Sequence, residues 1–427
     1  MKKVLIISYF FPPANFVGSE RVLSWTKYLS SFGIYPIIVT RNWNDEQTDI
    51  TGKIENNETR IEKFEGYEVH RVKYPYTLRD RCSKYPITKP FQKALTLYEL
   101  IFSNYFLGAI PYSNLYNYCD QLLTEDKEIK CVMASARPFQ SFAIGHRLKK
   151  KFDIKWIPDY RDPWTTSTSN IPTSRMGKFL HNLEKKSELK WTSNADAFTT
   201  VSDHLRDNIG DYNGKEGFVV KNGFDATSND LIQNSKNTKS ADEIKIIYIG
   251  TLYPYQPIEQ FIEAAIALKK KNSIQFSVNF IGTSPTENCD PRLQNLIADH
   301  KDLFIAKGRM KKDELLKLLP LYDLALATNY INLKGCIPVK LYDYFMFDLP
   351  TLLFPSDDDL MSDFISTTNS GYVVNNSLEF DTLMSKLDIE KRENKKLLTN
   401  RNIEEGMKYS RENQARILSD ILKKFID

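Results

Sequence analysis

The most constraining feature of this 427-residue chain is a repeated alternation of short apolar runs with longer segments of helical periodicity. Each run is a few residues long, which is typical of a strand covered on both faces in a parallel sheet. The helical segments between the runs supply the crossovers that parallel strands need. The pattern therefore predicts an α/β fold built from doubly wound sheets.

The predicted strands fall into two sets separated by a polar stretch. The first set is residues 4–8, 36–40, 131–135, 156–159, 197–201 and 218–221, and the second is 244–249, 276–281, 303–305, 324–327 and 351–354. Residues 226–243 between them are rich in Ser, Asn, Thr, Asp and Lys, as domain linkers are. We therefore predict domains at 1–225 and 226–404, with a C-terminal helix over about 405–427 that packs back on the first domain.

One stretch of the second set, residues 335–350, carries a candidate phosphate site. It places Lys340 and Asp343 at the start of a short amphipathic helix that leads into a buried strand. A helix N-terminus carries a partial positive charge, so a lysine there makes a seat for phosphate oxygens. Lys/Asp pairs three residues apart also decorate surface helices, and the spacing alone leaves both interpretations open.

The loop after the first predicted strand is a second candidate phosphate site. It contains Gly18, followed by Ser19 as N-cap of a helix. Strand, glycine loop and helix N-terminus together are the means by which α/β folds hold diphosphates. A dinucleotide fingerprint needs three spaced glycines, so a nicotinamide oxidoreductase is disfavoured. An ordinary strand-to-helix turn also carries one glycine.

The turn after residues 156–159 places Arg161 and Asp162 where α/β folds keep catalytic groups, at the carboxyl end of a strand. Pro163 and Trp164 follow and are expected to stiffen and shield the turn. Salt bridging within a tight turn is the alternative role.

A basic segment runs from Arg71 to Lys93, with seven basic residues against the single acid Asp80. Tyrosines are interleaved, and an apolar helix is predicted over 94–107. Such a composition suits an anionic membrane surface, and a solvated face followed by a core helix is the alternative. The net charge of +4 does not by itself indicate a nucleic-acid partner. Five scattered cysteines without a CxxC pair indicate neither disulfides nor zinc, and fit a reducing cytoplasm.

Six segments resemble, in order, the motifs of bacterial glycosyltransferase family 4, in the subgroup that builds cell-surface polysaccharides. They are SYFFPPANFVGSERV, IPDYRDPWT, TTVSDHL, VKNGFD, IYIGTLYP and VKLYDYFMFDLPTLL, which together span nearly the whole chain. The resemblance implies the GT-B fold, in which two Rossmann-like doubly wound domains face a central cleft.

The same resemblance implies a retaining transfer of a sugar from a nucleotide diphosphate sugar to a hydroxyl, without metal or another cofactor. The acceptor, a glycan or lipid-linked glycan, would bind the N-terminal domain and the donor mainly the C-terminal one. The expected location is the cytoplasm, at the inner face of the cell membrane.

Carried over position by position, the resemblance gives each candidate residue a role. Gly18 would let the first loop approach the donor diphosphate, and Lys340 would neutralise the leaving phosphates. Asp343 stands where the family's second motif glutamate meets the ribose. The other implied donor contacts are Gly250, Thr251, Leu341 and Tyr342. Arg161 and Asp162 lie near the position at which many relatives have an active-site histidine.

The chain also departs from the family pattern. Gly335 stands in place of the first motif glutamate, and Thr251, Leu252 and Gln256 replace an arginine and a lysine that often follow the strand ending at Gly250. These changes fit a divergent transferase or a non-catalytic GT-B partner of another transferase. A nucleotide-sugar epimerase is a further alternative, which the five scattered histidines do not support.

Overall fold

The computed structural model describes residues 1–14, 17–43, 58–74, 78–83, 89–102, 104–106, 112–168, 171–226, 243–271, 274–284, 288–394, 397 and 400–426. The chain forms two compact units. The N-terminal unit comprises Met1–Lys221 and Arg411–Asp427, and the C-terminal unit comprises Asn222–Ser410. The predicted linker lies almost entirely outside the described residues.

The N-terminal unit is built on an eight-stranded sheet in the order β3-β4-β2-β1-β5-β6-β7-β8. Neighbouring strands pair in parallel except for β3 and β4, which form an antiparallel pair. The strands are β1 (Lys2–Ser8), β2 (Ile34–Arg41), β3 (Arg60–Phe64), β4 (Tyr67–Val72), β5 (Ile129–Ser135), β6 (Lys155–Tyr160), β7 (Phe198–Thr200) and β8 (Gly217–Val219).

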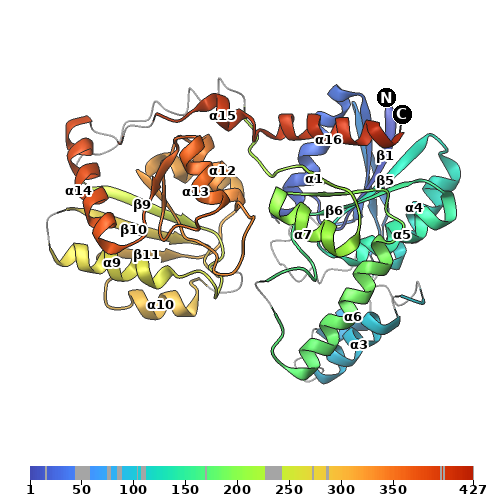
Figure 1. Ribbon diagram of the computed structural model, residues 1–427, viewed down its shortest axis with the longest axis horizontal. Coiled ribbons are helices and arrows are strands. Elements are labelled where there is room, and N and C mark those ends of the chain that lie inside the picture. The colour runs from blue at the N-terminus through green and yellow to red at the C-terminus, as the bar shows by residue number, and fades with distance from the viewer. Residues whose placement is uncertain are drawn as a thin grey trace. The chain divides into compact units, whose positions relative to one another are not determined.

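Helices cover both faces of this sheet (Figure 1). They are α1 (Val17–Tyr28), α2 (Leu78–Ser83), α3 (Lys89–Phe102), α4 (Ser113–Glu125), α5 (Gln140–Phe152), α6 (Arg175–Thr192), α7 (Asp203–Asn213) and α16 (Arg411–Ile426), with a 3-10 turn at Leu29–Phe32. On one face, Trp25 of α1 and Leu418 of α16 share a core with Ile157. On the other, Phe142 of α5 contacts the ring of Trp156, because successive strand residues point to opposite faces.

The C-terminal unit has a six-stranded parallel sheet in the order β11-β10-β9-β12-β13-β14. Its strands are β9 (Ile244–Ile249), β10 (Phe276–Ile281), β11 (Phe304–Lys307), β12 (Leu324–Ala327), β13 (Thr351–Leu353) and β14 (Gly371–Val373). Its helices are α9 (Ile258–Lys270), α10 (Pro291–Ile297), α11 (Lys312–Leu318), α12 (Val339–Met346), α13 (Leu360–Thr367), α14 (Ser377–Asn394) and α15 (Ile403–Met407), with a 3-10 turn at Leu319–Leu321.

Different helices pack on the two faces of this sheet. Phe261 of α9 and Phe380 of α14 join the core on the side of Ile246. Tyr344 of α12 packs on the opposite side, with Ile247.

The predicted α/β fold of two doubly wound units is confirmed, and a strand is present at each of the eleven predicted positions. The antiparallel pair β3–β4 and strand β14 were not predicted. Arg71, expected in the basic membrane segment, lies within β4. None of the helices in the described part of the chain is long and apolar enough to cross a membrane.

Candidate functional site

Each sheet has one point at which its strand order reverses, and the two candidate sites lie there. In the N-terminal unit β1 lies between β2 and β5, and in the C-terminal unit β9 lies between β10 and β12. Chains that leave the carboxyl ends of such a strand pair turn to opposite sides and open a crevice that holds ligands. The loops after β1 and β5, and those after β9 and β12, are therefore the places to examine.

In the C-terminal unit the loop after β12 leads into α12, whose second residue is Lys340. Its Nζ lies 3.7 Å from the centroid of the Tyr248 ring, at the end of β9. No carboxylate of the described residues pairs with this ammonium group. The structure thus brings a residue from each side of the switch point into contact.

Burial governs the protonation of Lys340. It lowers the pKa of this lysine to about 7, because the surroundings disfavour the charged form and supply no neutralising carboxylate. A ring face offers only about 0.5–2 kcal/mol to a cation. An anion that arrived at the N-terminus of α12 would therefore meet both the helix dipole and an uncompensated ammonium group.

The loop after β9 carries Gly250 and Thr251. The backbone N–H of Gly250 donates to Ile281 (2.9 Å), and the carbonyl of Thr251 accepts from the hydroxyl of Tyr248 (3.3 Å). Gln256, one of the residues in place of the family's basic pair, is fully buried, and its Oε1 accepts from the N–H of Tyr253 (2.9 Å). Gln256 therefore shapes this loop.

Tyrosine rings from the loops after β9 and β12 lie together. The rings of Tyr253 and Tyr255 are stacked with centroids 5.4 Å apart, and Tyr255 lies 5.9 Å from Tyr330 of the loop after β12. Burial raises the pKa of Tyr330 well above its ordinary value, so it stays neutral. Arg292 of α10 fixes the loop by donating to the carbonyls of Tyr253, Pro254 and Gln256. Sequence reasoning missed this cluster, whose signal is four tyrosines near two strand ends, Tyr248, Tyr253, Tyr255 and Tyr330.

The remaining α12 residues are placed as follows. Asp343 lies one turn after Lys340 and is nearly buried, at 9% exposure. Leu341 and Tyr342 lie in the hydrophobic core, where Tyr342 contacts the rings of Phe364 and Tyr409. These two side chains hold α12 against the unit.

Gly335, in place of the family's glutamate, has a backbone φ of +77°. A side chain at this φ is strained, so glycine suits the loop conformation that the protein has here. Its N–H donates to Oδ2 of Asp359 at 2.5 Å, which ties the loop to the start of α13. The glycine in place of the carboxylate thus belongs to a loop conformation that favours glycine.

In the N-terminal unit the structure brings Gly18 and Arg161 together. A β-carbon on Gly18 would lie 1.8 Å from Nη1 of Arg161, so the guanidinium occupies the space that a side chain would need. Nε of Arg161 donates to the carbonyl of Ala136, at the end of β5. Burial lowers the pKa of Arg161 from its ordinary value, and the group remains a cation at neutral pH. Gly18 therefore admits this guanidinium to the first turn of α1.

Asp162 lies beside a second arginine that the sequence did not single out. Nε of Arg137 is 3.6 Å from Oδ2 of Asp162, and both side chains are about half exposed. Aromatic rings pack against the turn behind them: Trp164 stacks on Phe139 (centroids 4.7 Å apart) and on Trp191 (5.5 Å).

A buried network under this turn was also missed. The carboxylate of Asp159 is fully buried and accepts from Arg21 (Nη2, 2.8 Å), Ser135 (2.7 Å) and Thr199 (2.8 Å). Arg21 also donates to the carbonyl of Val220 (2.7 Å). All of these groups are paired, as buried charges must be, so the network positions the strand ends.

Comparison with known proteins bears on the fold. Neither a protein-family model nor a curated protein matches the chain. Solved structures do match: sucrose-phosphate synthase from Thermosynechococcus elongatus (TM-score 0.64, 12% identity, 99% of each chain) and a glycosyltransferase from Rickettsia africae ESF-5 (0.58, 13%, 100% of this chain and 99% of that one) are two. A third is HepE from Anabaena, solved in complex with UDP and glucose (0.54, 11%, 99% and 100%).

The chain is therefore a protein of the GT-B fold. Its likeness to these glycosyltransferases extends over both units, since the matches cover essentially the whole of each chain.

Proposed function

We propose that the protein is a glycosyltransferase that moves a sugar from a nucleotide diphosphate sugar to a hydroxyl of a lipid-linked glycan. The observation that carries this proposal is Lys340. It is a half-buried lysine without a carboxylate partner among the described residues, placed at a helix N-terminus at the switch point of a GT-B sheet. A protein keeps such a costly charge where an anionic ligand compensates it.

In this proposal the donor binds the C-terminal unit. Its diphosphate lies at the N-terminus of α12 against Lys340, Asp343 accepts hydrogen bonds from the ribose, and the backbone of Gly250 and Thr251 borders the crevice. Leu341 and Tyr342 support α12 from the core. The tyrosine cluster of the loops after β9 and β12 supplies ring faces for the base or the sugar.

The reaction is a retaining transfer. The bond between the anomeric carbon and the diphosphate oxygen breaks, and the acceptor oxygen bonds to the same face of that carbon. The proton of the acceptor hydroxyl passes to the departing diphosphate oxygen. Lys340 and the helix dipole stabilise the charge that develops on the departing diphosphate, which is usually the largest contribution to catalysis. This assignment needs neither a metal nor another cofactor.

The acceptor binds the N-terminal unit, with Arg161 and Asp162 as the catalytic contacts to sugar or acceptor. Arg161 is fixed by Ala136 and the first turn of α1, and Asp162 faces solvent beside Arg137. The proposed location is the cytoplasmic face of a bacterial membrane, and the proposed role is surface polysaccharide synthesis.

Donor binding tests the proposal. The protein is titrated with UDP-, GDP- and dTDP-sugars, and release of the nucleoside diphosphate is followed. Lys340→Met should weaken binding of the preferred donor by about 10- to 100-fold, because a charge-assisted contact of roughly 1.5–3 kcal/mol is lost. Lys386→Met on the exposed face of α14 is the matched control and should bind normally. Unchanged affinity in Lys340→Met would refute the assignment.

A second candidate function, a non-catalytic partner of another transferase, is favoured by Gly335 in place of the glutamate. It predicts donor binding without nucleoside diphosphate release in the presence of any glycan acceptor.

A further inference from the structure

Large apolar side chains crowd one part of the N-terminal unit. The described residues expose nineteen large apolar side chains, and nine of them lie on α3, the turn after it, and the segment that includes α6. Single exposed apolar residues are ordinary, but a cluster of this kind marks an interaction site.

Helix α3 supplies the first half of the cluster. It is apolar in composition (KPFQKALTLYELIF), yet none of its described side chains is buried. The exposed aromatic residues of α3 and its following turn are Phe91, Tyr98, Phe102, Tyr105 and Phe106. A helix with an apolar face and no core beneath most of it is typical of a surface that meets a lipid or a protein partner.

Helix α6 supplies the second half. Its buried residues all lie in its last six positions, beginning at Ser187, so its first twelve residues extend beyond the core. Exposed Met176, Phe179 and Leu189 lie on it, and Ile171 lies just before it.

The two helices form one surface. They lie side by side and project from the sheet of the N-terminal unit (Figure 1). Asn104 joins them by donating to the hydroxyl of Ser187 (2.7 Å) and accepting at its carbonyl from Nζ of Lys190 (2.6 Å). We call the exposed residues of 90–106 and 171–190 the α3–α6 surface.

All exposed charges on the described part of this surface are positive. They belong to Lys93, Arg175, Lys178, Lys186 and Lys190, whereas the acids Glu99, Glu184 and Glu188 are partly or wholly buried. Burial also raises the pKa of Glu184 and Glu188, which weakens their negative charge. The surface therefore attracts anions along its whole length.

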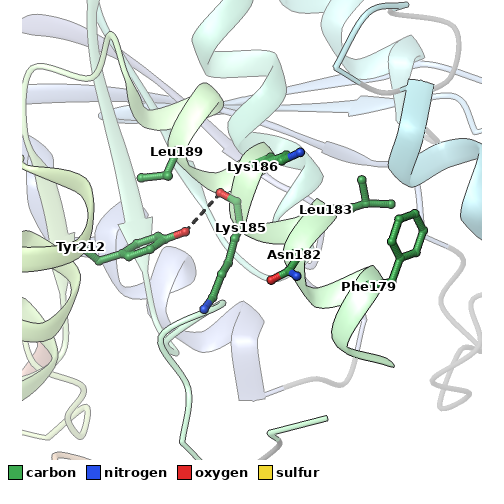
Figure 2. A pocket seen from close by; sticks show the side chains of 7 residues that line it. All are labelled: Phe179, Asn182, Leu183, Lys185, Lys186, Leu189 and Tyr212. Carbon is green, nitrogen blue, oxygen red and sulfur yellow. Dashed lines mark hydrogen bonds between the residues drawn. The ribbon is translucent and has the colours of Figure 1, made fainter. Parts of the chain in front are cut away.

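A hollow of about 500 Å³ lies on α6 within this surface. Figure 2 shows Phe179, Leu183 and Leu189 beside it together with two lysines, Lys185 and Lys186. The hydroxyl of Tyr212 closes one side by donating to the carbonyl of Lys185 at 3.2 Å. Apolar walls beside ammonium groups suit an anionic lipid. Its acyl chain matches the apolar side chains, and its negatively charged headgroup pairs with the lysines.

We propose that the α3–α6 surface docks on an anionic lipid bilayer. Aromatic side chains enter the headgroup boundary, and the lysines contact anionic headgroups. A second copy of the chain fits poorly, because a two-fold contact would oppose two surfaces of the same positive sign.

This assignment moves the membrane contact away from the predicted Arg71–Lys93 segment. Arg71 is largely buried in β4, where its Nε pairs with Glu62 at 2.8 Å and its Nη1 donates to the carbonyl of Pro12. Part of the segment lies outside the described residues. Lys93 is the member of the segment that the α3–α6 surface retains.

Vesicle flotation of the full chain tests the proposal without donor or acceptor, so its outcome is independent of the transferase assignment. Vesicles of phosphatidylcholine alone are compared with vesicles that contain phosphatidylglycerol. We expect binding only to the anionic vesicles, and weaker binding at high salt because surface charges are screened.

Two double variants test separately the positive charge and the apolar side chains of the surface. Lys178→Gln/Lys186→Gln should lower the partition coefficient about 25-fold, since each lysine near an anionic surface contributes about fivefold. Phe102→Ser/Phe179→Ser should lower it at least tenfold at unchanged charge. Leu378→Ser/Ile389→Ser, which removes two exposed apolar side chains of α14, is the matched control and should float normally.

Four outcomes would overturn the proposal. They are no flotation with anionic vesicles, equal flotation of wild type and both surface variants, equal flotation with both lipid compositions, and a dimer in sedimentation experiments that the surface variants dissociate. Circular dichroism of each variant establishes that it is folded.

Discussion

Two lysines of the C-terminal unit show what the surroundings do to one residue type. Lys391 is almost fully buried and pairs with Asp323 at 2.5 Å, so its charge is neutralised. Lys340 faces the ring of Tyr248 and has no described carboxylate partner, so its burial is uncompensated. The first arrangement serves the fold, and the second favours the arrival of an anionic ligand.

The pKa of Lys340 makes donor affinity depend on pH. In the free protein the pKa of Lys340 is lowered from 10.5 to about 7. A bound diphosphate favours the ammonium form and so raises the pKa of this lysine. Affinity is therefore greatest below pH 7 and falls as pH rises through the free-state pKa, by up to about tenfold per pH unit. Calorimetric titration with a nucleotide diphosphate sugar between pH 6 and 9 measures this. The phosphates of that ligand do not titrate in the range.

Lys340→Met is the control for the pH profile, because its weaker binding should be independent of pH. A wild-type affinity that is flat between pH 6 and 9 would contradict the assigned role of the ammonium group.

Single residues were predictable from the sequence only where local order defines their surroundings. Lys340 was singled out because a strand, a helix start and a lysine follow one another along the chain. The partners of Asp159 were not found, because Arg21 lies 138 residues away and meets the carboxylate only through sheet order. The tyrosine cluster was missed for the same reason, since Tyr255 and Tyr330 come from loops of different strands.

At the scale of elements, the contact of Gly18 with Arg161 joins the first turn of α1 to the turn after β6. Because the guanidinium fills the place of a side chain, Gly18→Ala should destabilise the N-terminal unit by about 1–3 kcal/mol, the usual cost of overpacking. With Arg161→Ala in the background the clash is gone, and the same substitution should be neutral or stabilising by up to about 1 kcal/mol, since alanine favours helix over glycine.

A double-mutant cycle measured by urea unfolding checks this coupling. Gly210→Ala in α7 is the control, because its β-carbon meets nothing closer than 3.4 Å. Gly210→Ala should change the free energy of unfolding by the same amount in the wild-type and the Arg161→Ala backgrounds. Equal effects of Gly18→Ala in both backgrounds would show that the two elements are not coupled here.

The elements that the sequence failed to predict lack the pattern of a buried strand. β3 (RIEKF) is exposed or half exposed along its length and alternates charged with apolar residues, so it has no continuous apolar run. It pairs only with β4 at the sheet edge, where one face remains open to water. β14 (GYV) is short and begins with a glycine, a residue that is depleted in strands, and none of its three residues is fully buried.

Helix α3 was predicted from its apolar and aromatic residues, with a core role and a membrane role both left open. The distinction needed the structure, because apolar periodicity indicates a face and does not indicate what covers it. None of the described side chains of α3 is buried, which disfavours the core role.

At the scale of the whole molecule, the chain forms the sheet of the N-terminal unit, then that of the C-terminal unit, and ends in α16, which belongs to the N-terminal unit again. In each, the strand order reverses beside the first strand of the unit, and each candidate site lies at that reversal. The sequence could predict two such sheets because most of their strands are continuous buried runs. It could not fix which loops meet, since strand order in space differs from order along the chain.

The last helix provides a test of how the chain is divided. Leu418 of α16 is fully buried in the core with Trp25 and Ile157, which lie much earlier in the sequence. Leu418→Ala should therefore cost about 2–5 kcal/mol in the stability of the N-terminal unit, through lost burial and a cavity. Native-state hydrogen exchange should show lost protection within residues 1–221 and unchanged protection within 222–410.

The matched variant is Leu387→Ala, which removes an equally buried leucine of α14 from the core around Phe261 and Phe380. It should lower protection within 222–410 and leave 1–221 unchanged, the reverse of Leu418→Ala. Because both variants delete the same atoms from fully buried sites, any difference in where protection is lost reports the unit to which each helix belongs. Loss spread evenly over both units in either variant would mean that the two units unfold as one cooperative body, in which case α16 would not be an element of the N-terminal unit alone.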